Sequence, residues 1–457
     1  MAERPHVVIV GAGFGGLAAA KRLEREAVDV TLIDRHNYHT FQPLLYQVAT
    51  AGLNAADVGY AVRGLFRRQK RVLFRKGLVT GVDWERREVL LRDEPPIAFD
   101  HLILAAGSTT NTFGIPGAAE LAFPLYGLED AVRLRNHIIS LFEAADAVPA
   151  LVDDGVLTFV VVGGGPTGVE VAGALAELVD NVLADDFHDL DVHCARILLV
   201  EQADHLLGAF SGRSQRYARR ELDEHRIDLR FATAVDQVMP DCVHLSDGTI
   251  LPTRTVIWAA GVKASPLADV LGVEQGRAGR VTVNRDLSLP GHPNAFVVGD
   301  LADVDDGHGG RLPQLAQPAL QMGKHAAEQV LATIGRRPRT DFAYQDRGTM
   351  ATIGRKAAVA ELPGGTRLTG PVAWVAWLVL HLLYLLGVRN KISVLINWAW
   401  NYFTWDRGPR LILRPERLPH TPHPHSDGDE PWRPAEVVTS GASPSTDPAP
   451  SAPSATS

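Results

Sequence analysis

The chain has 457 residues, 46% of them hydrophobic, which is enough for two or three domains with separate cores. The 45 basic and 53 acidic residues give a formal net charge of −8, so no nucleic-acid partner is expected. The chain has two cysteines, Cys194 and Cys242, far apart in the sequence. This excludes a Cys-x-x-Cys redox pair and a Cys-rich metal or iron–sulfur site, so redox chemistry would need an organic cofactor and no metal.

The amino-terminal segment is apolar only briefly. Residues 1–6 lead straight into Val-Val-Ile-Val at 7–10, which is too short for a signal-peptide core and is typical of a buried parallel strand. We therefore expect the protein to stay in the cytosol.

A dinucleotide-binding pattern follows this strand. The pattern needs glycine at three points. One glycine permits a tight turn, one lets pyrophosphate approach the backbone, and one lets the helix pack closely on the strand. A helix over 17–25 would offer its unpaired N–H groups to phosphate. A second strand, 28–33, ends at Asp34, whose carboxylate can bind a ribose hydroxyl. An ordinary tight turn would not need these parts in this order. The three glycines are Gly11, Gly13 and Gly16.

The same pattern occurs a second time. The apolar run 157–162 leads into a glycine-rich turn and a helix to position 177. The next strand, 197–200, ends at Glu201, after an apparent insertion over 180–194. A carboxylate there bonds a 2′-hydroxyl and repels a 2′-phosphate, which favours NADH over NADPH; the alternative is a solvated acid at a strand end. The glycines of this second turn are Gly163, Gly165 and Gly168.

Three further strand-and-turn segments, 102–108, 256–261 and 295–300, stand in the order typical of one superfamily. With the two glycine turns, they resemble the two-dinucleotide-binding flavoproteins. The resemblance implies an α/β fold of two Rossmann-like domains, with the NAD lobe inserted in the FAD lobe. It also implies that Asp300 contacts the ribitol and phosphate of a non-covalent FAD.

The identity of the electron acceptor has to be argued from other segments. The segment 312–321 leads into an expected helix that continues through 322–334, and Pro318 suits the first turn of that helix, where a proline costs no hydrogen bond. Its N-terminal dipole would stabilise an anionic reduced flavin. Gln317 and Gln321 are four residues apart, so their amides share one helix face and could bond quinone oxygens. On spacing alone, two glutamines that face water are the simpler interpretation.

Three segments are similar to those of the type II NADH dehydrogenases: 41–50, 166–170 and 316–321, the last with the Ala-Gln-x-Ala-x-Gln signature. The resemblance implies hydride transfer from NADH to FAD and then electron transfer to a membrane quinone without proton pumping. It makes Glu170, Gln317 and Gln321 the catalytic candidates. It implies that Glu170 lies near the nicotinamide and orients NADH, although Glu170 could be an ordinary first-turn helix carboxylate.

The resemblance also implies cofactor positions beyond the glycines and acids. Those for FAD are Phe14, Gly15, Arg35, Thr50, Ala106, Gly107, Leu315 and Ala316. Those for NADH are Pro166, Thr167, Ala260 and Gly261.

The C-terminal region is unusually apolar and aromatic. Residues 372–388 are apolar except for His381, the triplet 389–391 breaks the run, and the tryptophan-rich segment 392–405 follows. We expect amphipathic helices dipped into one leaflet, peripheral on the cytoplasmic face of the cell membrane. A spanning helix, a buried core helix and a homodimer interface are the alternatives. Lys391 would take part in the quinone or proton path, or anchor to headgroups. Headgroups are also the expected partners of Arg407, Arg410, Arg414 and Arg417.

Two other functions compete: a reductase of a ferredoxin- or rubredoxin-type acceptor, and a flavin redox sensor. Sulfide:quinone and disulfide reductases are excluded because they need reactive cysteines.

A tail rich in Pro, Ser and Ala is expected to be disordered. The expected domains are a FAD domain at 1–125 and 285–340, an NADH domain at 126–284, a membrane-associating region at 341–415 and the tail at 416–457.

Overall fold

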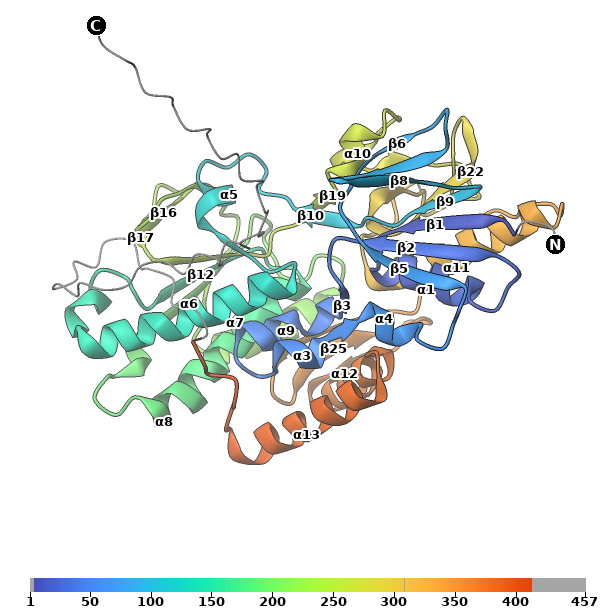
Figure 1. The fold of residues 1–457 in the computed structure, drawn as a ribbon. Helices are drawn as coiled ribbons and strands as arrows, with labels where there is room; N and C mark the ends of the chain where they lie inside the picture. The colour runs from blue at the N-terminus through green and yellow to red at the C-terminus, as the bar shows by residue number, and fades with distance from the viewer. Residues whose placement is uncertain (1–3, 308, 413–457) are drawn as a thin grey trace, which may run out of the picture. The chain divides into compact units, whose positions relative to one another are not determined.

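Two α/β units and a C-terminal module make up residues 4–307 and 309–412, the part of the chain that this computed structural model describes (Figure 1). The predicted tail, as well as Arg414 and Arg417, lies outside the described residues.

The first unit is built on a six-stranded sheet whose strand order is β21-β22-β9-β1-β2-β5. Its central strand β1 has four of five residues buried, as expected for a strand covered on both faces. Strand β22 pairs in parallel with β9 although the whole second unit lies between them in sequence. The predicted insertion of one lobe in the other is therefore confirmed. The strands are β1 (His6–Val10), β2 (Asp29–Asp34), β5 (Val72–Lys76), β9 (His101–Leu104), β21 (Ser288–Leu289) and β22 (His292–Val297).

The second unit has a five-stranded parallel sheet in the order β11-β18-β12-β13-β14. Helices α6 (Leu128–Ala147) and α7 (Pro166–Leu178) belong to this unit. Its strands are β11 (Phe123–Pro124), β12 (Thr158–Val162), β13 (Arg196–Val200), β14 (Asp228–Arg230) and β18 (Thr255–Trp258). The chain passes between the two units through a two-stranded antiparallel ribbon of β10 (Ser108–Thr110) and β19 (Val262–Ala264).

Helices α1 (Phe14–Leu23) and α11 (Ala316–Ile334) pack against each other in the first unit. At Gly323 the backbones come so close that an added Cβ would lie 2.0 Å from the carbonyl oxygen of Gly15. A helix residue with any side chain cannot fit there without moving α11. This contact fixes where the N-terminus of α11 stands.

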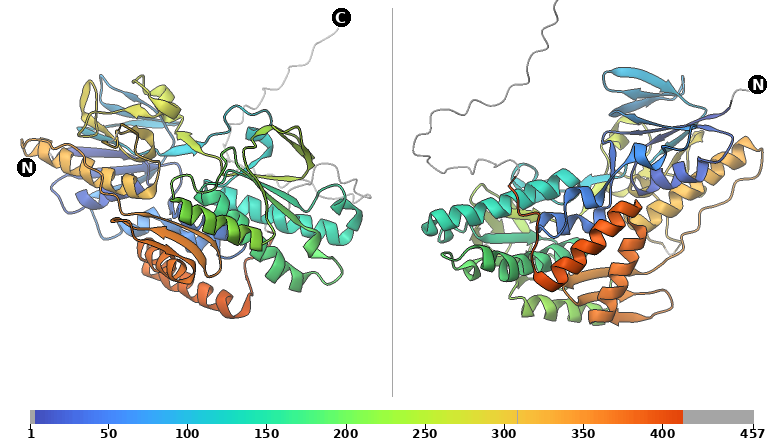
Figure 2. Two further views of the ribbon diagram at one scale, coloured as in Figure 1. Left: turned by 180° about the vertical axis from the view of Figure 1, so that it is seen from behind. Right: turned by 60° about the horizontal axis from the view of Figure 1, so that its bottom comes forward.

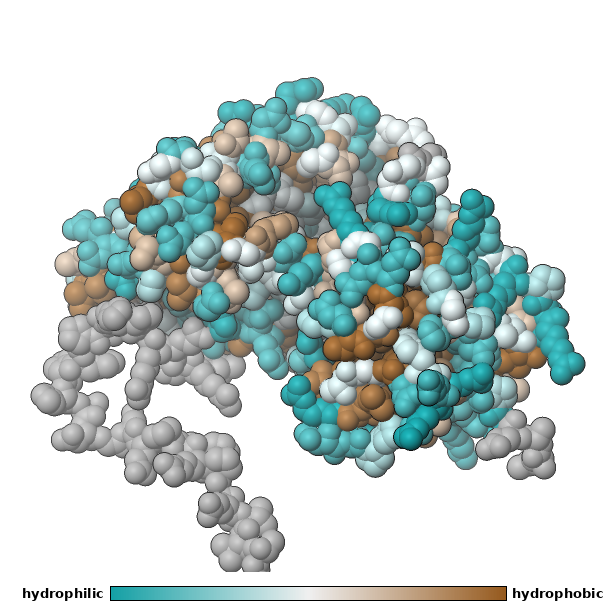
Figure 3. All heavy atoms as spheres, turned by 90° about the horizontal axis from the view of Figure 1, so that it is seen from above, coloured by the Kyte–Doolittle hydropathy of each residue, from teal (hydrophilic) through white to brown (hydrophobic). Residues whose placement is uncertain are grey.

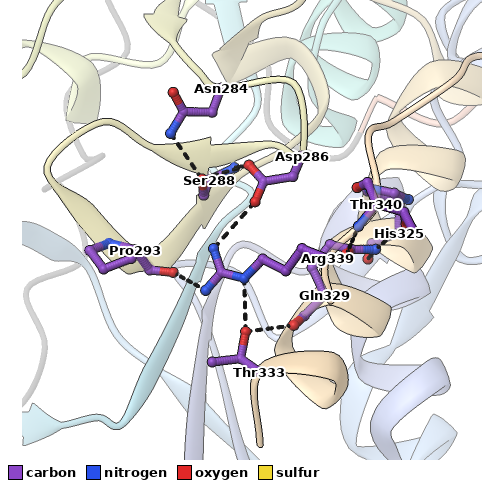
Figure 4. A network of polar contacts seen from close by, with 9 residues as sticks. All are labelled: Asn284, Asp286, Ser288, Pro293, His325, Gln329, Thr333, Arg339 and Thr340. Atoms are coloured by element: carbon purple, nitrogen blue, oxygen red, sulfur yellow. Dashed lines mark hydrogen bonds and ion pairs between the residues drawn. The ribbon is translucent and has the colours of Figure 1, made fainter. Parts of the chain in front are cut away.

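A polar network fixes the chain just after α11 (Figure 4). The Arg339 guanidinium donates to Thr333 Oγ1 at 2.9 Å, to Asp286 Oδ2 at 3.3 Å and to the carbonyl of Pro293. Burial alone would raise the pKa of Asp286, but hydrogen bonds from Ser288 and Arg339 outweigh it and lower that pKa. The network ties the exit of α11 to the β21–β22 hairpin.

The C-terminal module is a three-stranded antiparallel sheet followed by two helices. The sheet consists of β24 (Thr349–Gly354), β25 (Ala357–Glu361) and β26 (Arg367–Thr369). Strand β24 lies against α7, and an added Cβ at Gly173 would be 1.6 Å from the carbonyl oxygen of Ile353. The module is thereby joined to the helix that follows the second glycine turn.

Helices α12 (Gly370–Tyr384) and α13 (Val388–Thr404) form the predicted pair and lie side by side in the right-hand view of Figure 2. The predicted break is wrong in position, because the triplet 389–391 lies in the first turn of α13 and the chain turns at 385–387 instead. Gly387 there has φ +81°, which favours glycine. No helix within the described residues has both the length and the hydrophobicity to cross a bilayer.

We expect Gly323→Ala to destabilise the protein by about 1–3 kcal/mol, because the overlap with the Gly15 carbonyl outweighs the higher helix propensity of alanine. Thermal unfolding followed by circular dichroism would measure the effect. Gly212→Ala, in a helix position where the nearest atom belongs to the flexible Arg216 side chain, is the matched control and should be neutral. Equal melting temperatures for both variants would contradict the close contact.

Candidate functional site

A cavity of about 680 Å³ lies at the carboxyl ends of β1, β2, β9 and β22. Ligands of parallel α/β sheets bind at this edge. The segment at the N-terminus of α11 lines it as well. The predicted FAD residues in its lining are Gly11, Gly13, Phe14, Gly15, Asp34, Arg35, Ala106, Gly107, Asp300, Leu315 and Ala316.

The three glycines of the first turn do different work. Gly11 has φ +104°, and an added Cβ would lie 2.2 Å from the carbonyl oxygen of Ala105. A Cβ at Gly16 would lie 1.8 Å from the carbonyl oxygen of Gly11, so Gly16 serves helix–strand packing. A Cβ at Gly13 would meet nothing within 4 Å, and Gly13 lines the cavity. The turn is therefore closed on the protein side and open on the cavity side, which suits a pyrophosphate held by the start of α1.

Asp34 supports this turn as well as facing the cavity. Its Oδ2 accepts the N–H of Ala12 at 2.6 Å, and its Oδ1 accepts the N–H of His36 at 2.7 Å. Nearby, the ring of His39 contacts the carbonyl of Ala12 at 2.9 Å, and burial lowers the pKa of His39 to about 4. The carboxylate keeps acceptor capacity for a ribose hydroxyl. Sequence analysis missed His39, since a lone histidine carries no motif.

Asp300 lies at the opposite side of the sheet, after β22. Its Oδ2 accepts the hydroxyl of Ser108 at 2.7 Å, and Ser108 in turn bonds the hydroxyl of Tyr126 at 2.9 Å. Burial raises the pKa of Asp300, while the Ser108 hydroxyl opposes that shift. Ser108 and Tyr126 also line the cavity but were not predicted. Together with the N-terminus of α11, whose first turn holds no acidic residue, this wall fits the ribitol and isoalloxazine end of FAD.

The second glycine turn repeats the first. Gly163 has φ +107°, and an added Cβ would lie 2.8 Å from the carbonyl oxygen of Ala259. A Cβ at Gly168 would lie 1.8 Å from Gly163, whereas one at Gly165 would meet nothing within 4 Å. The turn opens α7 in the same way that the first turn opens α1.

Glu201 in the second unit holds its turn as Asp34 does in the first. Its Oε2 accepts the N–H of Gly164 at 2.5 Å, and its Oε1 accepts the N–H of Ala203 at 2.7 Å. The carboxylate is therefore held by the turn at the end of β13, which favours the predicted role over that of a freely solvated acid. The other predicted NADH residues stand on the turns after β12 and β18: Pro166, Thr167, Ala260 and Gly261.

Glu170 stands on α7, where the second unit meets the C-terminal module. Its Oε1 accepts the N–H of Thr352 at 3.3 Å. Enclosure by protein raises its pKa to about 8, and the donors on Thr352 and Trp377 act in the opposite direction. The carboxyl group is therefore protonated at neutral pH, unlike an ordinary first-turn helix carboxylate.

Glu170 lines a second cavity of about 450 Å³, which is mostly apolar and aromatic. A chain of hydrogen bonds runs along its wall: Trp398 Nε1 to Gln47 Oε1 at 2.7 Å, Gln47 Nε2 to the Tyr46 hydroxyl at 2.9 Å, and that hydroxyl to Thr352 Oγ1 at 3.0 Å. The rest of the wall comes largely from α12 and α13. An apolar cavity with a few fixed polar groups suits a lipophilic ligand.

The segment 41–50, predicted to lie under the flavin, contributes to both cavities: Gln42 lines the first, and Tyr46 and Gln47 line the second. Thr50 lines neither cavity, and its hydroxyl donates to the carbonyl of Tyr46 at 2.9 Å. The structure therefore does not place Thr50 with the other predicted FAD residues.

The three residues predicted to bind quinone are not brought together. Gln317, in the first turn of α11, Gln321 and Lys391 line neither of the two cavities. The amide of Gln321 is bonded twice to the backbone of Gln345. Lys391 Nζ donates to the carbonyl of Leu383 at 2.7 Å, at the end of α12.

The expectation that Arg407 and Arg410 meet headgroups is wrong. Arg407 is buried, and its Nη2 donates to Glu177 Oε2 on α7 at 3.1 Å. Arg410 forms an ion pair with Asp186 at 3.0 Å. A buried guanidinium needs such a partner, and sequence alone could not supply it.

Comparison with known proteins agrees with this geometry. The family model of pyridine nucleotide-disulphide oxidoreductases matches residues 5–323, and that of the NDH2 C-terminal domain matches 347–404. The chain is 39% identical to the type II NADH:quinone oxidoreductase Ndh of Mycobacterium tuberculosis, over 92% of each chain. It is 31% identical to the type II NADH:quinone oxidoreductase of Staphylococcus haemolyticus, over 81% of this chain and 92% of that one.

The solved structure of NDH2 from Plasmodium falciparum in complex with NADH has the same fold. The two superpose with a TM-score of 0.82 at 20% identity, over 90% of this chain and 100% of that one.

Two glycine turns, each between a strand of an α/β sheet and a helix, and the match of the family model to residues 5–323 define a flavoprotein of the pyridine nucleotide-disulphide oxidoreductase class. Within that class, the chain belongs to the type II NADH:quinone oxidoreductases.

Two matched substitutions should separate the cofactor sites. Gly13→Val should give folded protein that has lost most of its FAD, because the new side chain enters the cavity and meets no protein atom. Gly165→Val should keep FAD but raise the KM for NADH, because it has the same free space in the second unit. Flavin absorbance of the purified variants and steady-state kinetics would measure both effects. Loss of FAD from Gly165→Val alone would reverse the assignment.

Proposed function

We propose that this type II NADH:quinone oxidoreductase binds NADH at the second glycine turn and a membrane quinone in the apolar cavity beside Glu170. Bound FAD supplies the two-electron chemistry, accepting hydride from NADH and returning electrons to the quinone. The observation that carries the proposal is that one cavity combines a half-buried carboxyl group, whose pKa is raised to about 8, with walls from the two C-terminal helices. The alternatives of a protein-acceptor reductase and a redox sensor have no comparable support.

Most of the protein's contribution is positioning. The turn at 163–168 would hold the pyrophosphate of NADH, and Glu201 would accept its ribose hydroxyl. The first turn, Asp34 and Asp300 would hold FAD, with the start of α11 directed at its reacting end. Segment 41–50, which has residues in both cavities, would separate the flavin from the quinone. Gln317, one residue beyond the cavity-lining Ala316, stays a predicted quinone ligand although it lines neither cavity.

Glu170 is the candidate proton donor. Reduction of a quinone to a quinol by NADH takes up one proton beyond the transferred hydride, and an apolar cavity gives water little access to deliver it. Burial keeps the Glu170 carboxyl protonated up to about pH 8. Burial also raises the pKa of the Tyr46 phenol, so that the hydroxyl keeps its proton within the hydrogen-bonded chain. Glu170 would give its proton to a quinone oxygen and regain one from solvent.

The pH profile tests this role. The protonated form of Glu170 is lost as pH rises through about 8, so quinone-dependent kcat should fall above that pH. Glu170→Gln should lower kcat at pH 7 by about 100-fold and flatten the profile. Reduction of ferricyanide, which needs no proton, should show no such fall.

The measurement is NADH oxidation by FAD-replete protein with a short-chain quinone in liposomes. Absence of quinone turnover in the unaltered protein would overturn the function. An unchanged profile in Glu170→Gln would overturn the proton role alone.

The outer face of α12 and α13 supports attachment to a bilayer. Val388 is 75% exposed and Phe403 81%, and they belong to a larger set of exposed apolar side chains: Val372, Val375, Val379, Leu383, Ile392, Leu395, Ile396 and Trp400. A soluble surface rarely exposes so many together. On the face shown in Figure 3, by contrast, hydrophobic and hydrophilic residues are interspersed.

Cations stand where α12 turns into α13. Lys391 bonds the end of α12, Arg389 is on the same first turn of α13, and Arg347 Nη1 donates to the Tyr384 hydroxyl at 3.3 Å. Lys21 is near enough that the charge of Lys391 acts on it, although burial is the main cause of its lowered pKa. Such cations suit anionic headgroups. We place the enzyme peripherally on the cytoplasmic face of the cell membrane, where NADH is supplied.

Charges placed on this face should release the enzyme from the membrane. The double variant Ile396→Asp/Phe403→Asp should bind vesicles at least about tenfold more weakly, because a buried charge is costly in the bilayer interface. Co-sedimentation with liposomes would measure this. Leu73→Asp, at an equally exposed apolar position on β5, is the control and should bind normally. A change in oligomeric state without a change in vesicle binding would show instead that the face joins two copies of the chain.

A further inference from the structure

One face of α11 forms a ladder of polar contacts with the chain that follows it. Its members are four residues apart and so lie in a row along the helix. The partners run in the opposite direction over 339–345, a stretch without helix or strand. The members are Gln321, His325, Gln329 and Thr333.

The middle of this ladder appears in Figure 4. His325 Nε2 contacts the carbonyl of Thr340 at 3.0 Å. Gln329 Oε1 accepts the N–H of Thr340 at 2.8 Å, and its Nε2 donates to the Thr340 hydroxyl at 3.2 Å. Thr333 accepts from Arg339, as described above. Backbone groups outside helices and sheets need partners of this kind.

Gln321 is the first member of the ladder and uses its whole amide. Its Nε2 donates to the carbonyl of Gln345 at 2.9 Å, and its Oε1 accepts the N–H of Gln345 at 3.0 Å. This reciprocal pair imitates the pairing of two backbone strands. Among the described residues, the amide of Gln317, one turn earlier, has no hydrogen-bond partner. The amide of Gln317 is therefore available to a ligand, whereas the amide of Gln321 is already hydrogen-bonded to the protein.

The residues after Gln345 lead directly to the quinone cavity. Arg347, two positions on, bonds Tyr384 at the end of α12. Strand β24 begins at Thr349 and carries Thr352, which bonds both Glu170 and Tyr46. A shift of the backbone at 345 would therefore move the wall of the second cavity.

We propose that Gln321 is a positioning residue that fixes the C-terminal module through the backbone of Gln345, and that it is not a quinone ligand. The inference rests on the proposed quinone site. It divides the signature into two roles, with Gln317 free for the quinone and Gln321 committed to the protein.

A double-mutant cycle tests it. Gln321→Ala removes both hydrogen bonds, and Gln345→Pro removes the one that the Gln345 N–H donates. Each should lower quinone-dependent kcat relative to ferricyanide reduction by about fivefold. The double variant should be no worse than Gln321→Ala alone. Gln345→Ala, which keeps the backbone, is the control and should behave like the unaltered enzyme.

A quinone ligand would give a different pattern. Gln321→Ala would then raise the KM for quinone, as expected for Gln317→Ala, while Gln345→Pro would leave it unchanged. That result, or multiplied effects in the double variant, would overturn the proposal.

Hydrogen exchange gives a second test that needs neither quinone turnover nor a folded proline variant. The amide of Gln345 should exchange faster in Gln321→Ala, whereas Gln321→Glu keeps the acceptor and should keep the protection. Equal exchange in the unaltered protein and Gln321→Ala would overturn the proposal even if the quinone site is correct. If quinone turnover is absent altogether, the proposed function fails, and the exchange result stands separately.

Discussion

Two close backbone contacts at glycines hold the parts of this enzyme in place. A side chain at either glycine would overlap a neighbouring carbonyl group. Gly323 sets α11 against α1, and Gly173 sets β24 against α7, with added Cβ atoms 2.0 Å and 1.6 Å from carbonyl oxygens. The first contact directs the start of α11 at one cavity. The second brings Thr352 to Glu170 at the other. Both cavities therefore depend on glycines that bind no ligand themselves.

The two cavities differ in kind because different surroundings form them. The first is lined largely by turns and helix starts, whose N–H groups and dipoles suit phosphates. The second is lined by aromatic and aliphatic side chains of α12 and α13, with a few polar groups linked to one another. Placing a carboxyl group in the second cavity changes its chemistry, since an enclosed acid keeps its proton.

Local features could be predicted from the sequence. The glycine turns, the acids at strand ends and the split first sheet are encoded within short segments, and the structure has them at the predicted positions. Contacts between distant segments could not be predicted: Ser108 with Asp300, Arg407 with Glu177 and Gln321 with Gln345. The two residues of each pair are far apart in the sequence, and neither carries a motif that would identify its partner.

The turn between α12 and α13 shows how one sequence signal can hide another. The polar triplet 389–391 suggested a break, but Asn390 holds α13 in place by donating to the carbonyls of Ala56, Asp57 and Gly59. Gly387 was the better signal. An added Cβ there would lie 2.1 Å from the Tyr60 ring, so the turn also packs against the first unit.

Glu201 has two roles, as the proposed ribose ligand and as the hydrogen-bond acceptor that holds the turn. These two roles constrain how the enzyme could change its electron donor. Accepting a 2′-phosphate requires removal of the negative charge, but the same carboxylate ties Gly164 and Ala203 into the turn that receives the pyrophosphate. A switch to NADPH therefore cannot be a single exchange of acid for base. It needs a second substitution that restores the lost backbone partner, so coenzyme preference and loop integrity would have to evolve together.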